Sequence, residues 1–443
     1  MPKAKSLKQR FINYILPSTI SLWVFSIYSI VDGFFVARFA GVEEFSSVSL
    51  VIPFVNVLFA LAILLSIGAQ TLIGIDLGQG KLAEARQLFT FIMRFVTGFA
   101  LAIMLLGFLF MKPLLVILGA QGEFFELSQA YLRIILLFSP FFIISYSFEV
   151  LVKIDGFPRV AVIGAITSCL TNVLLDYIFI AHCHWSVTGA ALATGLAQFL
   201  STFIYLLHFW RKIGPLGFVK TKTPWQKASR RLTEIIYIGL GEFISEFNAA
   251  SILFIFNTFI LRYLGEAYIA PYAVMNYIAL FVSCTYQGVC HGTAPLLSYY
   301  YGRKDESAQR QLLRYGFVTI LALSLLAYGF TFFAGHTILG LFLKEASQVE
   351  AATPMLRHYA LAFLLSGYNV FIAAIASAVK RPIYGILINL GRGSVFVLLA
   401  LWLILSFLGQ NAFFYAAPLA ELLTLALAAF TFYQLQKNKR QTL

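Results

Sequence analysis

The sequence predicts an all-α, polytopic membrane protein with twelve transmembrane helices, arranged as two pseudo-symmetric six-helix bundles around a central cleft. Three observations predict this fold class. Hydrophobic residues make up 60% of the 443-residue chain and charged residues only 12%, with a mean hydropathy of +0.84, and a soluble domain of this composition would aggregate. Twelve apolar runs are each long enough to cross a bilayer. The sequence also repeats itself at an offset of 224 residues.

Each predicted span is an apolar run that meets the length of about 20 residues needed to cross a bilayer core. Strands of a β-barrel alternate over about ten residues, so these long continuous runs exclude a barrel. In chain order the predicted spans are 11–37, 47–75, 88–111, 128–152, 159–181, 187–210, 235–262, 267–299, 311–334, 351–377, 383–408 and 412–435.

The basic residues are unevenly distributed, which explains the net charge of +13 without a nucleic-acid partner. If the N-terminus lies in the cytoplasm, 24 of the 32 Lys and Arg residues fall in cytoplasmic segments, as the positive-inside rule requires. We therefore expect a multi-pass protein of the plasma (inner) membrane with both termini cytoplasmic. The first run is too long for a signal peptide and has no small-residue cleavage site before Asp32, so we interpret it as a retained helix.

The repeat divides the chain into two halves. One gapless shift aligns helix 2 with helix 8 and helix 4 with helix 10, which predicts parallel six-helix lobes at 1–210 and 232–443 joined by a cytoplasmic basic linker at 211–231. Two such lobes favour alternating access, and a duplicated scaffold that does not rock is the alternative. The coincident pairs include Gly68 with Gly292, Gly78 with Gly302, Arg133 with Arg357, and Pro158 with Pro382.

Six carboxylates lie inside predicted spans, where an ionised acid costs roughly 2.5–3.5 kcal/mol on insertion scales. Such an acid is tolerated when it faces water, has a partner or carries a proton, so each is a candidate ion or substrate site. A paired structural acid is the alternative for any single one. The six are Asp32, Glu149, Asp176, Glu242, Glu246 and Glu421.

Two places in the first half combine an acid with a second informative residue. Asn172 and Asp176 are four residues apart in helix 5, so their side chains lie on one face and form a compact oxygen site. Asp32 follows Pro17 by fifteen residues in helix 1, and a proline inside a helix favours a kink or hinge. Glu149 is the third acid of this half, and an ion pair with a lysine four residues later is its structural alternative.

The second half also offers candidates for a substrate cleft. Glu242 and Glu246 are four residues apart on helix 7, where like charges repel, so we expect them to titrate jointly. Glu421 stands alone among Leu and Ala on helix 12. Aromatic rings beside acids favour organic cations, although packing explains most of the aromatic residues. The remaining cleft candidates are Asn257 on helix 7 and Tyr28, one turn before Asp32.

No enzyme signature is present. The chain has no glycine-rich phosphate loop and no nucleotide-binding domain, so we expect a protein that is not an enzyme, uses no cofactor and draws its energy from a gradient of H⁺ or Na⁺. The segment His182-Cys183-His184 matches no standard metal-site spacing, and no metal site is predicted.

Several motifs together resemble the multidrug and toxic compound extrusion (MATE) transporters, in a prokaryotic branch, over nearly the whole chain. These motifs are IVDGFFVAR in helix 1, LVKIDGFPR after helix 4, NVLLDYIFI in helix 5, TGAALAT in helix 6 and QGVCHGTAPLLSYYYG in the second half.

The resemblance implies a cation or proton site in the first lobe, formed by Asp32, Asn172, Asp176 and Thr194. Glu149 corresponds to a helix 4 position that is often uncharged in this family, which would make the site more acidic. Some members have a sodium site with acids on helices 7 and 10. Helix 10 here has Asn369 and no carboxylate, which argues against that site.

We therefore expect an antiporter that exports amphipathic organic cations, in exchange for H⁺ or Na⁺, by alternating access. A lipid-linked oligosaccharide flippase of the same superfamily is the alternative, but buried acids outnumber buried arginines by six to four. A passive channel is the remaining possibility. The expected partners are small organic cations and membrane lipid, with no nucleic acid and no obligatory protein partner, and the expected form is a monomer.

Overall fold

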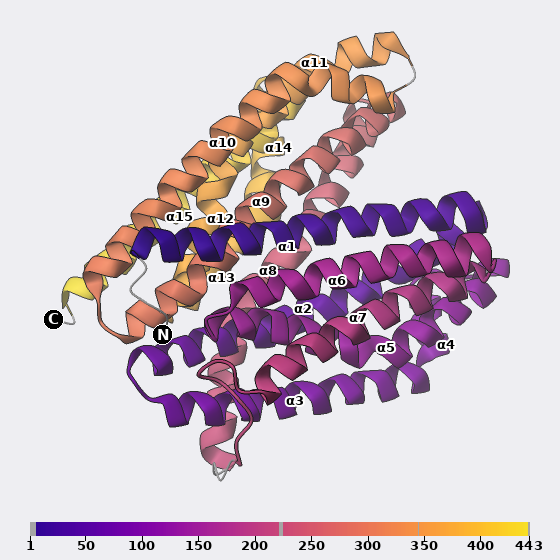
Figure 1. The fold of residues 1–443 in the computed structure, drawn as a ribbon. Coiled ribbons are helices and arrows are strands. Elements are labelled where there is room, and N and C mark those ends of the chain that lie inside the picture. The colour runs from indigo at the N-terminus through magenta and orange to yellow at the C-terminus, as the bar shows by residue number, and fades with distance from the viewer. Residues whose placement is uncertain (1–5, 221–224, 344, 442–443) are drawn as a thin grey trace. The chain divides into compact units, whose positions relative to one another are not determined.

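The structure is a computed structural model that describes residues 6–220, 225–343 and 345–441 (Figure 1). Every regular element in the described ranges is helical, which confirms the predicted fold class. Twelve helical segments are long and apolar enough to cross a membrane, which confirms the predicted number of spans. They are Leu7–Ala40, Val42–Gly78, Leu82–Leu109, Phe124–Ile154, Pro158–His182, Ser186–Trp210, Ala228–Tyr263, Glu266–Gly302, Glu306–Phe342, Ala346–Ala378, Pro382–Phe407 and Gln410–Lys437.

The chain forms two compact units. Unit 2 comprises Leu16–Gly239 with Ser298–Lys304, and unit 1 comprises Met1–Ile15, Leu240–Leu297 and Asp305–Leu443. The lobes at 1–210 and 232–443 stay a prediction, and the two units have other bounds than those lobes. They differ because three long helices each divide between the units, namely α1 (Leu7–Phe35), α8 (Trp225–Tyr263) and α9 (Ile269–Gly302).

Unit 2 is built around two long helices, α2 (Val42–Gly78) and α5 (Glu123–Ile154). Helix α2 packs along α5, α5 packs along α7, and α6 packs along α7, as the neighbouring ribbons in Figure 1 show. Buried aliphatic and aromatic side chains such as Leu72, Phe89 and Phe209 fill the core. The other helices of unit 2 are α3 (Leu82–Leu109), α4 (Met111–Ile117), α6 (Pro158–Asp176) and α7 (Ser186–Trp210).

Unit 1 is centred on α12 (Phe363–Ala378), which packs against α10, α13 and α15. The tenth span, predicted as one helix, is two helices, because α11 ends at Ala360 and α12 begins at Phe363. The remaining elements are α10 (Glu306–Phe342), α11 (Ala346–Ala360), α13 (Pro382–Leu390), α14 (Phe396–Phe407) and α15 (Ala416–Gln441), with short 3₁₀ turns η3 (Glu266–Tyr268) and η5 (Gln410–Tyr415).

Three π-helical turns interrupt spans at polar positions: η1 (Val36–Ala40), η2 (Tyr177–His182) and η4 (Gly391–Val395). A π-helical turn inserts an extra residue, so it changes the direction of the side chains around it, and such turns are frequent at functional sites. Each of the three lies within one helical turn of an ionisable residue inside a span. The three turns therefore lie beside candidate functional residues inside the spans.

The linker between the halves is shorter than the predicted 211–231, because α8 already begins at Trp225. Two causes contribute. Lys and Arg are good helix formers, and Arg231 Nη1 pairs with Asp76 Oδ2 of α2 at 3.1 Å, which holds the start of α8 within unit 2. Residues 221–224 of the predicted linker lie outside the described residues.

Candidate functional site

A cluster of four polar side chains occupies the interior of unit 2. Asn172 and Asp176 lie one turn apart on α6, and Asn172 Nδ2 donates to Thr194 Oγ1 of α7 at 3.2 Å. Asp176 and Asn172 are buried, with exposed fractions of 0% and 1%. Asp32 of α1 lies against both of them. The structure therefore brings together the four residues predicted for a cation or proton site, from three separate helices.

Four of the oxygen atoms in this cluster lack donors. Among the described residues, no hydrogen-bond partner is found for Asp32 Oδ1, Asn172 Oδ1 or either carboxylate oxygen of Asp176, and all four atoms are sealed from solvent. A buried acceptor without a partner is costly. Two carboxylates in contact cannot both stay ionised unless a cation lies between them, and otherwise one of them holds a proton. The arrangement therefore suits a proton or a small cation that oxygen ligands can hold.

The local backbone places these acids. The π-helical turn η2 begins directly after Asp176, and η1 begins four residues after Asp32. The two turns pack against each other, and η1 also packs against α7. Two irregular helix segments thus meet beside the acids, so the acids lie where the main chain departs from regular α-helix.

An aromatic residue that the sequence did not single out borders the cluster. Tyr131 of α5 is 4% exposed and lies within electrostatic range of Asp32, Asp176 and Tyr28. This places the predicted residue Tyr28 near the cluster as well. No sequence signal could have found Tyr131, because a tyrosine on an apolar helix face usually reflects packing.

Glu149, the other acid predicted for this site, has a different environment. Its Oε1 accepts a hydrogen bond from Lys153 Nζ at 2.9 Å, and the Lys153 side chain is only 3% exposed. This is the i, i+4 ion pair that was the structural alternative for Glu149. In the part of the chain that the structure describes, no contact joins Glu149 to Asp32 or Asp176, so a role in the cation site stays a prediction.

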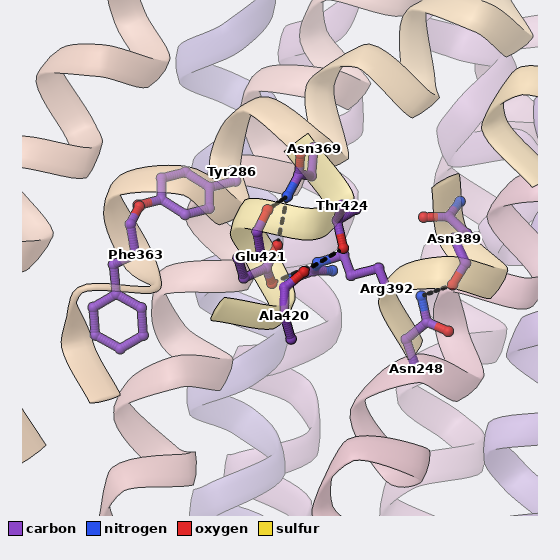
Figure 2. Close-up of polar contacts among 9 residues, drawn as sticks. All are labelled: Asn248, Tyr286, Phe363, Asn369, Asn389, Arg392, Ala420, Glu421 and Thr424. Atoms are coloured by element: carbon purple, nitrogen blue, oxygen red, sulfur yellow. Dashed lines mark hydrogen bonds and ion pairs between the residues drawn. The ribbon is translucent and has the colours of Figure 1, made fainter. Parts of the chain in front are cut away.

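Glu421 stands alone among Leu and Ala in its own stretch of sequence, but the fold gives it two partners, as in the paired structural acid that was the alternative for each of the six. Figure 2 shows Asn369 and Arg392 both pointing toward it in unit 1. Arg392 Nε donates to Glu421 Oε1 at 2.8 Å, and Asn369 Nδ2 donates to Glu421 Oε2 at 2.7 Å and to its backbone oxygen at 2.9 Å. The partners lie 29 and 52 residues away in the chain, so only the fold brings them together.

The other candidates of the second half are spread along α8. Glu242 is half-buried and lies within electrostatic range of Glu246, which is exposed. Asn257, about three turns beyond Glu246, is half-buried. In α1, Pro17 lies inside a helix that continues on both sides of it, next to the boundary between the units at Leu16. Its role as a hinge stays a prediction.

Comparison with known protein families shows to which family the chain belongs. A family model described as MatE matches residues 17–178 and again residues 243–403, which together make up most of the chain. The chain belongs to the MatE family. The two matched stretches fall in the two predicted lobes, as expected for a protein with an internal duplication, and they confirm the resemblance stated above.

Curated relatives within this family are exporters by name. The chain is 25% identical over 432 residues to "Multidrug export protein MepA" of Staphylococcus aureus, covering 96% of this chain and 93% of the relative. It is also 25% identical over 374 residues to the protein of the same name from Staphylococcus saprophyticus, covering 84% and 82%.

Solved transporter structures share the fold at lower sequence identity. An outward-facing multidrug resistance MATE transporter of the MOP superfamily superposes with a TM-score of 0.91 at 17% identity, covering 99% of this chain and 98% of that one. A mutant of the Vibrio cholerae transporter VcmN gives a TM-score of 0.88 at 20% identity, with 98% and 97% covered. A Pyrococcus furiosus transporter of the MOP superfamily gives 0.86 at 18%, also with 98% and 97% covered.

Proposed function

We propose that this MatE-family protein is a multidrug exporter that expels amphipathic organic cations from the cytoplasm in exchange for H⁺ or Na⁺, by alternating access. Its relatives of similar length are named multidrug export proteins. The observation that carries the proposal is the set of sealed acceptor oxygens on Asp32, Asn172 and Asp176. Both termini lie in the cytoplasm in this proposal, in keeping with the distribution of basic residues.

The coupling ion acts where the three helices meet. Asp32 is on α1, Asp176 on α6 and Thr194 on α7, so a bound proton or cation replaces repulsion between two carboxylates by attraction to a shared charge. The ion therefore draws α1 toward α6. Without the ion, the pair separates or admits water. Ion binding thus changes the relative energy of two arrangements of α1, which is what coupling requires.

Helix α1 can transmit this change along its length. Pro17 removes one main-chain hydrogen bond fifteen residues before Asp32, so α1 bends there at low cost. In the proposed cycle, ion binding bends α1 near Pro17, reduces the volume of the lobe interior and releases the substrate outward. A membrane potential of 100 mV supplies about 2.3 kcal/mol for each charge moved across the membrane, enough to bias the cycle strongly.

The test is gradient-driven export by purified protein in lipid vesicles. A fluorescent organic cation is loaded, and either a pH gradient or a sodium gradient is imposed alone, which identifies the coupling ion. The Asp32→Asn, Asp176→Asn double variant is expected to lose at least tenfold in initial uphill rate, because neither side chain then exchanges a proton or binds a cation strongly.

The matched control is Asp305→Asn. Asp305 caps α10 through a hydrogen bond from the Ala308 backbone amide to its Oδ1, and asparagine is an equally good cap, so export is expected to stay within about twofold of the unaltered protein. Uphill export by the double variant at the rate of the control would reject the proposed site.

A further inference from the structure

Three lysines have a backbone conformation that lysine rarely adopts. Lys212, Lys304 and Lys380 have φ angles of 50°, 57° and 58°, in the left-handed region, where a Cβ atom crowds the backbone and glycine fits without strain. Among the described residues, the other side chains in this region are those of His184 and Ser186. Asparagine, aspartate and histidine tolerate it better than other side chains do. An outlier of this kind is grounds for a functional hypothesis.

Each of these lysines ends a helix in the same way. Its backbone amide donates to the carbonyl oxygen three residues earlier, at 3.2, 3.1 and 3.2 Å in chain order. This bond closes the left-handed turn that ends many α-helices, where glycine is the usual residue. The turns follow α7, α9 and α12, which end the sixth, eighth and tenth candidate spans. In the proposed topology, all three turns therefore lie on the cytoplasmic side of the membrane.

The first repeat has glycine where the second repeat has lysine. The offset of 224 residues relates Lys304 to Gly80 and Lys380 to Gly156, and the φ angles of these glycines are 77° and 100°. Both glycine amides donate to the carbonyl oxygen three residues earlier, at 3.1 Å each. The turn therefore forms without lysine, and glycine forms it with less strain. What the second repeat adds is a positive charge at the cytoplasmic end of the helix.

An arginine adjoins each lysine, so every turn carries two positive charges. The basic pairs are Arg211–Lys212, Arg303–Lys304 and Lys380–Arg381. All three arginines are exposed. At the positions equivalent to Arg303 and Arg381, the first repeat has the uncharged residues Gln79 and Phe157. Trp210, directly before the first pair, is 72% exposed, and tryptophan is typical of the boundary between membrane and water.

The helix dipole offers a structural explanation for a lysine at this position, because a cation near a helix C-terminus is stabilising. The arginine beside each lysine supplies the same attraction without the strained backbone. The dipole alone therefore does not explain why lysine replaces glycine. A partner that gains from a second fixed positive charge does explain it.

We propose that the turns at Lys212, Lys304 and Lys380 bind the phosphate groups of anionic phospholipids in the cytoplasmic leaflet. Each turn places an ammonium and a guanidinium on consecutive residues at the end of a span, and phosphate oxygens accept charge-assisted hydrogen bonds from both groups. An anionic leaflet attracts basic residues that lie beside a span, which offsets the strain of the turn. The inference goes beyond the proposed export function, because it concerns lipid rather than substrate and uses only the proposed topology.

The test measures lipid binding by the purified full-length protein in detergent. Dioleoyl phosphatidylglycerol, which is anionic, and dioleoyl phosphatidylcholine, which is zwitterionic, are titrated separately while the midpoint of thermal unfolding is followed. Native mass spectrometry counts the lipid molecules that stay bound. We expect phosphatidylglycerol to raise the midpoint at a lower concentration than phosphatidylcholine does, and about 0.5 M NaCl to weaken this preference. Transport is not measured, so a failure of the proposed export function leaves the result unchanged.

The main variant combines Lys212→Gly, Lys304→Gly and Lys380→Gly, which gives every turn the residue that the first repeat uses. We expect its half-saturating concentration of phosphatidylglycerol to rise about fivefold or more, the factor that one basic residue contributes near an anionic surface. Without lipid, its unfolding midpoint should be unchanged or higher, because glycine relieves the strained backbone. The corresponding triple arginine variant keeps the charges, so its half-saturating concentration should stay within about twofold of that of the unaltered protein.

Two matched controls separate the strain from the charge. Ser186→Gly relieves a left-handed backbone without a change of charge, and Lys112→Gln removes an exposed lysine that follows the third span. Each should change the half-saturating concentration of phosphatidylglycerol by less than about twofold.

Four results would overturn the inference. The first two are equal affinity of the unaltered protein for the two lipids, and unchanged affinity of the triple glycine variant for phosphatidylglycerol. The third is a midpoint of the lipid-free glycine variant below those of both controls, which would show that the lysines hold the helix ends. The fourth is an equal rise of the midpoint with glycerol 3-phosphate, which would indicate a site for free phosphate rather than for lipid.

Discussion

Gly78 and Gly302 occupy equivalent positions in the two repeats, and each lies against the backbone of the helix that carries the other. A Cβ atom on Gly78 of α2 would overlap the carbonyl oxygen of Tyr299 in α9, and one on Gly302 would overlap the carbonyl oxygen of Ile75 in α2. The offset of 224 residues that relates the glycines also relates Ile75 to Tyr299. The contact of Gly78 with Tyr299 and the contact of Gly302 with Ile75 are therefore equivalent under the repeat. Both contacts lie within unit 2.

This contact should tolerate no side chain at either glycine. We expect Gly78→Ala and Gly302→Ala each to destabilise the protein by about 1–3 kcal/mol, because backbone atoms cannot move aside as flexible side chains do. The measurement is the midpoint of thermal unfolding in detergent. Gly329→Ala on α10 is the matched control, since a Cβ there meets no atom within 4 Å. Midpoints for the two variants at or above that of the control would contradict the prediction.

The hydrogen bond between Asn172 and Thr194 should matter for ion affinity more than for folding. Thr194→Val removes the acceptor of Asn172 Nδ2 while keeping the shape of the side chain, so the amide no longer has a fixed orientation. We expect the ion concentration for half-maximal export to rise about threefold to tenfold, corresponding to one lost hydrogen bond.

The control for this variant is Thr97→Val on α3, whose hydroxyl donates only to Met93 O of its own helix. An equal shift in the two variants would show that Thr194 acts through packing, and would remove it from the ion site.

Much of the fold and the first-lobe site could be predicted because the signals are local or periodic. Long apolar runs predict the spans, and the spacing of four residues places Asn172 and Asp176 on one face of α6. The convergence of Asp32 and Thr194 on this pair is not a local property. It was available only through the resemblance to a family.

The features that were not predicted depend on contacts between distant parts of the chain. Glu421 looked isolated because its partners Asn369 and Arg392 lie on other helices. The break between α11 and α12 lies at Leu361 and Ala362, where neither glycine nor proline marks it. The π-helical turns likewise were not predicted from the sequence. Long-range pairing and irregular helix geometry are therefore what the sequence could not show.

The ion pair between Glu149 and Lys153 should be a structural pair. Lys153→Met alone leaves a half-buried carboxylate without its partner, and we expect it to lower stability by about 1–3 kcal/mol. Combining it with Glu149→Gln removes both charges and should restore most of that loss. Thermal unfolding in detergent measures the difference, and vesicle export by the double variant should keep its ion dependence. A loss of ion dependence would instead place Glu149 in the cation site.

The first part of the linker is fastened to unit 2 through Asp155. Its Oδ1 accepts a hydrogen bond from the backbone amide of Leu216 at 2.6 Å, and its Oδ2 lies 2.8 Å from His208 Nε2. Asp155 and His208 are both buried, and Leu216 has no exposed surface. The carboxylate thus joins the end of α5, the end of α7 and the linker.

Removing this carboxylate should free the linker while leaving the spans folded. We expect Asp155→Ala to raise the rate of tryptic cleavage at Lys212 and Lys220 about tenfold or more, because two charge-assisted hydrogen bonds oppose local opening. Cleavage is followed by gel electrophoresis and mass spectrometry under native conditions in detergent. Glu306→Ala is the control, since its pair with Arg310 is exposed and contributes little. Cleavage of the Asp155 variant at the rate of this control would show that the linker is held by other contacts.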